Sequence, residues 1–302
     1  MHRAHTQIFG SLYNRGMGII MLKTDLHMHT NVSDGTWDVY ELKEKLKEND
    51  IKIFSITDHD DVGNIENMSN ILTPEDNLTF IKGVEVTATY NNREYHMTLY
   101  NYDINNKELL EFLKWTRDLR LDYNDKFIHY MSTLHESITF KDFLEYKEDR
   151  SRGGWKSSNY LIDKKIHKDM AEHFEDIKKS GLTITFKSPE EVINICKRSG
   201  GYIFLAHPSY HYKITVMPIE ELKMWLELGI DGVECYTPYN DKKQSEYYKE
   251  FCDNNNLMIS GGSDCHGDFI KERKLGIPTI DLSELKIDKL LNKNLTNYSF
   301  TK

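Results

Sequence analysis

Hydrophobic and polar positions follow two alternating patterns toward both ends of the chain. Short apolar runs, several with period two, predict strands at 22–26, 51–57, 78–86, 94–102, 202–206, 232–235 and 257–260. Segments with apolar positions every three or four residues predict helices at 39–48, 62–72, 189–199, 218–228 and 242–255. Strands that alternate with helices indicate an α/β fold, either a parallel sheet or an α/β barrel.

The middle of the chain has a different pattern. Residues 105–181 are polar, rich in aromatic and charged side chains, and helical in period, without a convincing strand. One predicted helix face carries Phe112, Trp115, Leu119, Tyr123, Phe127 and Tyr130, and such a stripe is far more often packing than a binding platform. The predicted organisation is therefore an α/β part at 21–104 and 186–302, a helical insertion or cap at 105–185, and an extension at 1–20 without an assigned role.

Composition and charge narrow the class of protein. The 302 residues are 39% hydrophobic and 29% charged, as in an ordinary globular chain. A formal charge of −9 argues against duplex nucleic acid as a partner, but it is compatible with a small anionic substrate held at bound metals. No apolar run approaches the ~20 residues that span a bilayer, so no membrane partner is expected. Four cysteines without a CxxC pair predict reduced thiols and a cytoplasmic location.

The first chemical signal is the run DLHMHTNVSDG. His27 and His29 are two residues apart at a predicted strand end, so both rings point the same way and can share a metal. Asp34, in a Ser-Asp-Gly turn, can return to the same pocket. An isolated HxH pair is more often two partly buried structural histidines than a metal site.

Recurrence of the same residue types makes the metal interpretation stronger. Other predicted strands carry Asp58 and His59 in SITDHDD, Glu85 in GVEVT, His96 in REYHMTLY, His207 in YIFLAHP, and Asp264 and His266 in ISGGSDCHGD. Glu85 stands in an apolar strand, and burial of a carboxylate is costly without a metal or an arginine beside it. Because the carboxyl ends of parallel strands face one crevice, we expect these side chains to meet there.

Nine side chains are therefore candidate metal ligands. They are His27, His29, Asp34, His59, Glu85, His96, His207, Asp264 and His266. Nine ligands are too many for one ion and suit two or three, with Glu85 bridging. Imidazole and carboxylate without thiolate favour Mn²⁺, Zn²⁺ or Fe²⁺.

In their order along the chain, these motifs resemble those of the PHP (polymerase and histidinol phosphatase) family. The matching runs are DLHMHTNVSDG, ITDHD, GVEVT, the EYH strand, FLAHP and GSDCH. The resemblance covers residues 22–104 and 186–302, and it implies a distorted (β/α)7 barrel with metals at the C-terminal strand ends.

Carried over by position, the resemblance implies three metal sites. The first would be held by His27, His29, Glu85 and Asp264, the second by Asp34, His59 and His207, and the third by Glu85, His96 and His266. The implied enzyme is a metal-dependent phosphoesterase that uses a metal-activated hydroxide. His207 or Asp58 could protonate the leaving oxygen, and Asp58 could also orient a ligand histidine.

Within the family, the spacing from GVEVT to the EYH strand most resembles the branch that hydrolyses nucleoside 3',5'-bisphosphates. Members of that branch can also trim short single-stranded RNA from its 5' end. The branch usually has an Arg-Gly-His type motif in its insert, where this chain has RSRGGWKSSNYLID. Arg152 and Lys156 in that run, and Arg273 further on, are candidate phosphate contacts, and Trp155 could stack on a base; an exposed loop explains the run equally well.

Three other functions fit the same residue types. One is a histidinol-phosphate phosphatase with a different pocket. Another is an amidohydrolase-type enzyme that attacks carbon, because the same ligands serve both reactions. The last is a non-catalytic metal-binding module, which would be expected to have lost ligands.

Overall fold

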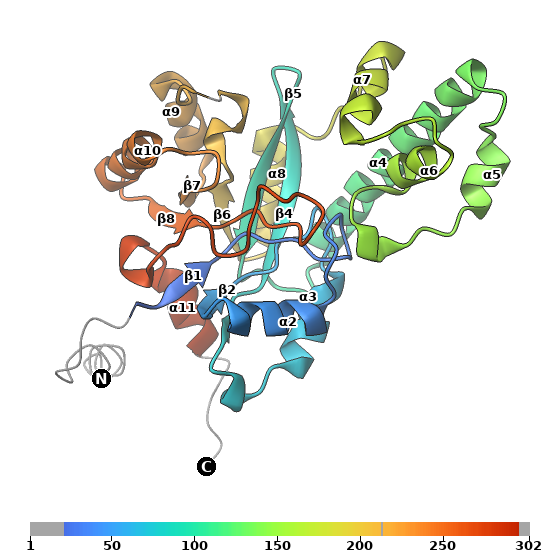
Figure 1. The fold of residues 1–302 in the computed structure, drawn as a ribbon. Coiled ribbons are helices and arrows are strands. Elements are labelled where there is room, and N and C mark those ends of the chain that lie inside the picture. Colours follow the sequence, from blue (N-terminus) through green and yellow to red (C-terminus); the bar gives the residue numbers. More distant parts are fainter. Residues whose placement is uncertain (1–20, 213, 296–302) are drawn as a thin grey trace, which may run out of the picture.

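The computed structural model describes residues 21–212 and 214–295, so the extension expected at 1–20 lies outside the described residues. Its strands form two sheets (Figure 1). The first has the order β1-β2-β3 and is built from β1 (Lys23–Asp25), β2 (Ile51–Phe54) and β3 (Thr79–Phe80). The second contains β4 (Gly83–Tyr90), β5 (Arg93–Tyr100), β6 (Tyr202–Leu205), β7 (Gly232–Tyr236) and β8 (Met258–Gly261), in that order.

Strand direction changes within the second sheet. The first sheet is parallel throughout, and β6, β7 and β8 are parallel to one another, whereas β5 runs antiparallel to both β4 and β6. Isolated parallel bridges join the sheets at Met28↔Cys265 and His59↔Glu85. The predicted α/β class is confirmed, but the strands of the described residues do not form one continuously paired, closed barrel.

The strand predicted at 78–86 is two strands in different sheets. Pairing of β3 with β2 ends at Phe80, and β4 starts at Gly83 beside β5. A Cβ on Gly83 would lie 2.2 Å from Ser55 Oγ and 2.8 Å from the carbonyl oxygen of Ile56. A glycine therefore lets the chain pass close to the end of β2 as it leaves the first sheet for the second.

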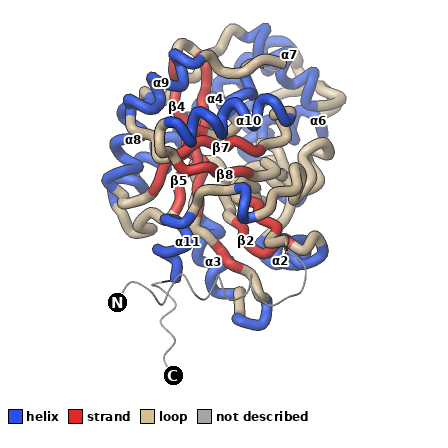
Figure 2. The backbone as a smooth tube through the Cα atoms, turned by 90° about the vertical axis from the view of Figure 1, so that its left-hand side faces the viewer, coloured by secondary structure: helices blue, strands red, loops and turns tan. Residues whose placement is uncertain are grey.

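Helices surround the two sheets (Figure 2). Those predicted from periodicity are α2 (Val39–Glu48), α3 (Gly63–Ile71), α8 (Pro189–Arg198), α9 (Ile219–Leu228) and α10 (Lys242–Asn254). Their starts follow helix-capping chemistry, since Asp38, Ser188 and Asp241 each accept backbone N–H bonds at the N-cap. Helix α11 (Asp288–Leu295) was not predicted. No helix among the described residues is long and apolar enough to cross a membrane.

The middle of the chain forms a helical lobe to one side of the sheets (Figure 1). It contains α4 (Lys107–Leu134), α5 (Phe140–Glu145), α6 (Lys156–Asp163) and α7 (Met170–Ser180). The start of α4 packs into the main core through Phe112, and its last turns join a separate apolar cluster through Phe127. The predicted aromatic stripe is only partly packing, because Trp115 is 39% exposed and lies under the ammonium group of Lys187.

Candidate metal centre

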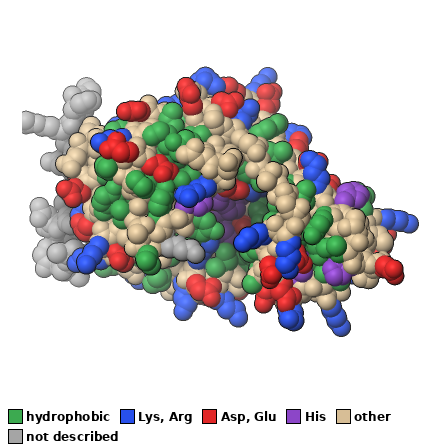
Figure 3. Space-filling model, turned by 90° about the horizontal axis from the view of Figure 1, so that it is seen from above, with side chains coloured by type: hydrophobic (Ala, Val, Ile, Leu, Met, Phe, Trp, Pro, Cys, Tyr) green, Lys and Arg blue, Asp and Glu red, His purple; other side chains and the backbone are tan. Residues whose placement is uncertain are grey.

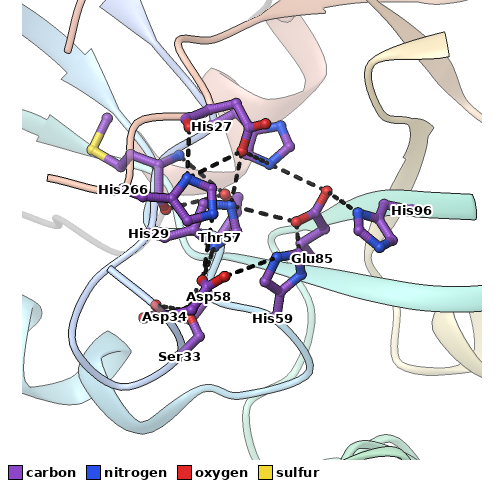
Figure 4. Close-up of polar contacts among 12 residues, drawn as sticks. His27, His29, Ser33, Asp34, Thr57, Asp58, His59, Glu85, His96 and His266 are labelled. Carbon is purple, nitrogen blue, oxygen red and sulfur yellow. Dashed lines mark hydrogen bonds and ion pairs between the residues drawn. The ribbon is translucent and has the colours of Figure 1, made fainter. Parts of the chain in front are cut away.

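The structure brings all nine predicted ligands together at one end of the sheets. His27 and His29 follow β1, His59 follows β2, and His207 follows β6. Glu85 and His96 lie within β4 and β5, while Asp264 and His266 follow β8, so separate segments converge on one cluster (Figure 4). The remaining ligand, Asp34, comes from the turn after His29.

Glu85 lies at the centre of the cluster. Each of its carboxylate oxygens faces more than one ring, at distances of 2.9 to 3.4 Å from histidine nitrogens. These nitrogens belong to His27, His29, His59, His96 and His207. The side chain is fully buried, so the histidines stand where a buried carboxylate needs positive partners.

Three overlapping groups have ligand atoms within 4.8 Å of one another. They are His27, His29 and Glu85; His29, Asp34, His59 and His266; and His59, Glu85 and His96. Asp264 completes the first group, with Oδ1 at 3.1 Å from His29 Nε2 and 3.5 Å from His27 Nε2.

The grouping implied by the family resemblance needs one correction. His266 lies beside Asp34, with Nε2 3.4 Å from Oδ1, and its ring stacks on that of His29. His207 instead lies 2.9 Å from Glu85 Oε1. The two histidines therefore exchange places between the second and third groups. The backbone of both loops is unusual here, since His207 has φ 27° and Asp264 has φ 49°, values that are uncommon outside glycine.

The donor set suits divalent metal ions. Four buried polar atoms of the cluster have no hydrogen-bond partner among the described residues: His27 Nε2, Asp34 Oδ1, His59 Nδ1 and Glu85 Oε2. Buried polar atoms are normally satisfied. Imidazole nitrogens and carboxylate oxygens that converge in this way are the donors that Zn²⁺, Mn²⁺ and Fe²⁺ take.

Burial and neighbouring charges shift the pKa values of the cluster residues in different directions. Burial opposes ionisation of Glu85, but the surrounding rings of His27 and His96 hold the pKa of its carboxyl well below the usual range. Burial also opposes protonation of His96, yet the nearby Glu85 carboxylate raises the pKa of that ring to about 10. Burial, together with the neighbouring His266 ring, lowers the pKa of His29 to about 3, so His29 is neutral and offers a lone pair.

Side chains behind the ligands hold the histidine rings in place. Two of them are carboxylates that the sequence analysis did not identify. Glu234 Oε1 lies 3.1 Å from His27 Nδ1, and its other oxygen accepts the backbone N–H of His207 at 2.7 Å. Glu94 Oε1 lies 2.9 Å from His96 Nε2. The sequence contained both signals: Glu234 is a carboxylate in the apolar run GVECY, as Glu85 is in GVEVT, and Glu94 shares a strand face with His96.

The role expected for Asp58 changes. Its carboxylate accepts from the backbone N–H and the hydroxyl of Thr30 and from the hydroxyl of Ser33, at 2.6 to 2.7 Å. It is fully buried and does not line the cavity above the ligands. Asp58 therefore fixes the loop that carries Asp34 and reaches His29 only through Ser33, whose Oγ is 3.5 Å from Nδ1. A proton-donor role for Asp58 does not fit this position.

An inner cavity of about 330 Å³ opens above the cluster. Seen from above, a hollow with histidine side chains inside it is flanked by Lys and Arg side chains (Figure 3). Arg273, a candidate phosphate contact, lines the cavity and lies 2.8 Å from Asp264 Oδ2. Arg120, which was not predicted, also lines it and donates to Glu94 at 2.6 Å. No periodicity marks a single arginine on a charged helix as part of a site.

The other two predicted phosphate contacts lie away from this cavity. Arg152 is paired with both carboxylate oxygens of Asp163 at 2.8 Å. Lys156 donates to the carbonyl of Leu144 and is not part of the inner cavity wall. Only Trp155 of that run lines it. Contact of Arg152 and Lys156 with a substrate phosphate stays a prediction, and neither residue is on the wall of the inner cavity.

Gly262 fixes the distance between β8 and the first ligand. A Cβ at this position would lie 2.4 Å from both the backbone nitrogen and the Cβ of His27. We expect Gly262→Ala to lower the free energy of unfolding by about 1–3 kcal/mol, the range for an overpacked core. Urea unfolding measures this. Gly63→Ala is the control for adding a methyl group, because its backbone is not left-handed and a Cβ there would come no closer than 3.2 Å, to a side-chain oxygen of Asp61. Equal stability of Gly262→Ala and the parent would contradict the packing.

Comparison with known proteins identifies the family of the chain. The model of the PHP domain family matches residues 25–179. The chain belongs to the PHP domain family. It is 25% identical over 253 residues to the 5'-3' exoribonuclease Rnm of Escherichia coli, a match that covers 80% of this chain and 84% of that protein. It is 23% identical over 254 residues to the 3',5'-nucleoside bisphosphate phosphatase of Chromobacterium violaceum. That match covers 82% of this chain and 88% of that protein.

A solved structure agrees with the family assignment. A protein from Bifidobacterium adolescentis, provisionally named a metal-dependent phosphoesterase, aligns with a TM-score of 0.76 and 25% identity, over 89% of this chain and 96% of that one. This PHP domain protein is thus a metal-dependent phosphoesterase, a hydrolase that acts on phosphate ester bonds. The histidine and carboxylate groups described above are where its metals could bind.

Proposed function

We propose that this PHP domain protein removes phosphate from a nucleoside 3',5'-bisphosphate or cleaves the 5' end of short single-stranded RNA. The observation that carries the proposal is the inner cavity, which is lined by seven of the nine candidate ligands and by Arg273 and Arg120. A histidine and carboxylate base with arginines above it suits an anionic ester. The two relatives named above act on these substrate classes by name.

The ligand sets of the proposal follow the corrected groups. His27, His29, Glu85 and Asp264 would hold one ion. Asp34, His59 and His266 would hold a second, and Glu85, His96 and His207 a third. His207 then serves as a ligand and not as the proton donor. Bound Mn²⁺, Zn²⁺ or Fe²⁺ would polarise the phosphoryl group and lower the pKa of a water nucleophile.

Arg273 would bind the phosphoryl oxygens. Its guanidinium lines the cavity and is held by Asp264 on one side and by the face of the Tyr239 ring, 5.1 Å away, on the other. Both contacts fix the planar fork so that its remaining N–H groups can face an anion. Asp264 would therefore both bind a metal ion and hold the arginine that contacts the substrate.

We also propose that residues 105–185 form a cap over the site. This segment holds its own apolar cluster, and Arg120 and Trp155 from it line the inner cavity. The two sheets, joined by bridges at Met28 and at His59, would then be the distorted barrel that the family resemblance implies.

Glu94 lies between Arg120 and the candidate ligand His96, so its replacement should weaken metal binding without abolishing it. Glu94→Gln removes the charge that holds the His96 ring, and we expect metal affinity to fall by about 10–100-fold, as for other carboxylates behind ligand histidines. Competition with a chelating dye measures the affinity. Glu221→Gln is the matched control, because Glu221 accepts from Tyr95 on the same strand, outside the cluster. Equal affinity in Glu94→Gln and the parent would remove Glu94 from the site.

The proposed function is tested by phosphate release from adenosine 3',5'-bisphosphate with Mn²⁺. Histidinol phosphate and a short 5'-phosphorylated RNA are the comparison substrates, and His59→Ala is the inactive control. We expect release that is abolished by a chelator and by the substitution. Turnover of histidinol phosphate without turnover of the bisphosphate or the RNA would contradict the proposed substrate class.

A further inference from the structure

A second, outer cavity of about 420 Å³ adjoins the inner one. His59, Arg120 and Trp155 line both cavities, so the two spaces meet at the metal ligands. The outer cavity lies under the middle of α4 and beside α5, where α4 leaves the main core and has not yet reached the helical cluster. Its volume is within the range of about 300–1,000 Å³ that small-molecule sites occupy.

The walls of the outer cavity are unusually apolar for a solvent-facing hollow. Leu121 on α4 is 59% exposed, and Leu144 on α5 is 58% exposed. Both line the cavity together with Phe143 and Trp155. Large apolar side chains that stay exposed inside a hollow mark a ligand site more often than a folding requirement.

Cations and carboxylates are close to balance in the outer cavity, where Arg117, Arg120, Arg150 and Lys156 face Asp61, Asp125 and Glu148. Arg150 donates to the backbone carbonyls of Asn31, Val32 and Ser33 at 2.6 to 2.7 Å. Arg117 lies 3.3 Å from Asp61, which also lines the cavity. The balance of cations and carboxylates does not favour a second phosphate. It suits a flat, uncharged group with polar edges.

We propose that the outer cavity binds the nucleoside part of a nucleotide whose scissile phosphate lies in the inner cavity. This inference rests on the proposed function, and it adds the site that selects a nucleotide over a simple phosphate ester. The Trp155 ring, at the wall shared by both cavities, stacks on the base. Leu121 and Leu144 cover the base and sugar, and the side chain of Asn124 on the same wall offers an amide to a polar edge.

Direct binding of adenosine to the Mn²⁺-loaded protein tests the site without any turnover. We compare the parent, the double variant Leu121→Asn/Leu144→Asn, and the control Leu134→Asn. Leu134 is 55% exposed on the same helix as Leu121 and lines neither cavity. Because the three leucines are exposed to a similar extent, each substitution carries a similar small risk to the fold.

We expect adenosine to bind the parent and Leu134→Asn equally, and the double variant about tenfold more weakly, as for loss of part of one leucine's apolar contact. The ratio of kcat/KM for adenosine 3',5'-bisphosphate to that for methyl phosphate should fall by a similar factor. Equal adenosine binding by all three proteins, or none by the parent, would overturn the outer site. Adenosine binding of the expected pattern without turnover of either the bisphosphate or the short RNA would instead refute the proposed function alone.

Discussion

Replacing Glu85 with glutamine should lower turnover by at least about a thousandfold, because metal-ion stabilisation of the transition state is worth several kcal/mol. The oxygens of Glu85 face histidines of all three proposed ligand sets. The substitution keeps the volume of the side chain and removes only its charge. Phosphate release at saturating Mn²⁺ measures the effect, with circular dichroism to verify the fold.

Glu234→Gln is the matched control for this prediction. Glu234 is equally buried and contacts His27, but it lies behind the ring and not among the ligand atoms. We expect a loss of about 10–100-fold, as for a carboxylate that only orients a ligand. If Glu85→Gln kept more than a tenth of the parent activity, or if both variants lost equally, a central bridging role for Glu85 would be wrong.

Asp264→Asn and Asp264→Ala should both abolish turnover but differ in stability. Asp264 contacts His29, Arg273 and the hydroxyl of Tyr239, so either change removes a ligand charge and the ion pair with the arginine. The backbone at this residue has φ 49°, which asparagine tolerates and alanine does not. We therefore expect the alanine variant to unfold more easily than the asparagine variant by about 1–2 kcal/mol.

Urea unfolding of the two metal-free variants separates these effects. The difference between them reports the left-handed backbone and the polar contacts that asparagine keeps, while the shared loss of turnover reports the carboxylate charge. Full activity in the asparagine variant would remove Asp264 from the metal site. Identical stability of the two variants would show that the left-handed turn is not strained.

The helix and strand pattern was predictable wherever burial and periodicity agree. Helix α2 begins and ends at the predicted residues, since its apolar face and the cap at Asp38 are both local. The division of 78–86 into β3 and β4 was not predictable, because it depends on how closely Gly83 passes Ser55, a residue of another segment. The middle of α4 carries helical periodicity like its ends, although it borders the cavities and not a core.

The membership of the metal cluster followed from a simple rule, but its internal arrangement did not. Strand ends that share one edge bring their side chains together, which was enough to collect all nine candidates. Which ion each would serve depends on the loops after the strands, which place His266 beside Asp34 and His207 beside Glu85. The side chain of Arg120 reaches the site from a helix of the lobe, a contact that only the packing of two distant segments creates.

The most direct test of the metal centre is X-ray diffraction from crystals grown with Mn²⁺, with data collected at the manganese absorption edge. We predict two or three anomalous peaks within the cluster, with His266 and Asp34 at one ion, and His207 and His96 sharing another with Glu85. Metal-to-ligand distances of about 2.0–2.2 Å to nitrogen and oxygen are expected. A cluster without any anomalous peak, in a protein that still hydrolyses its substrate with Mn²⁺, would contradict the account.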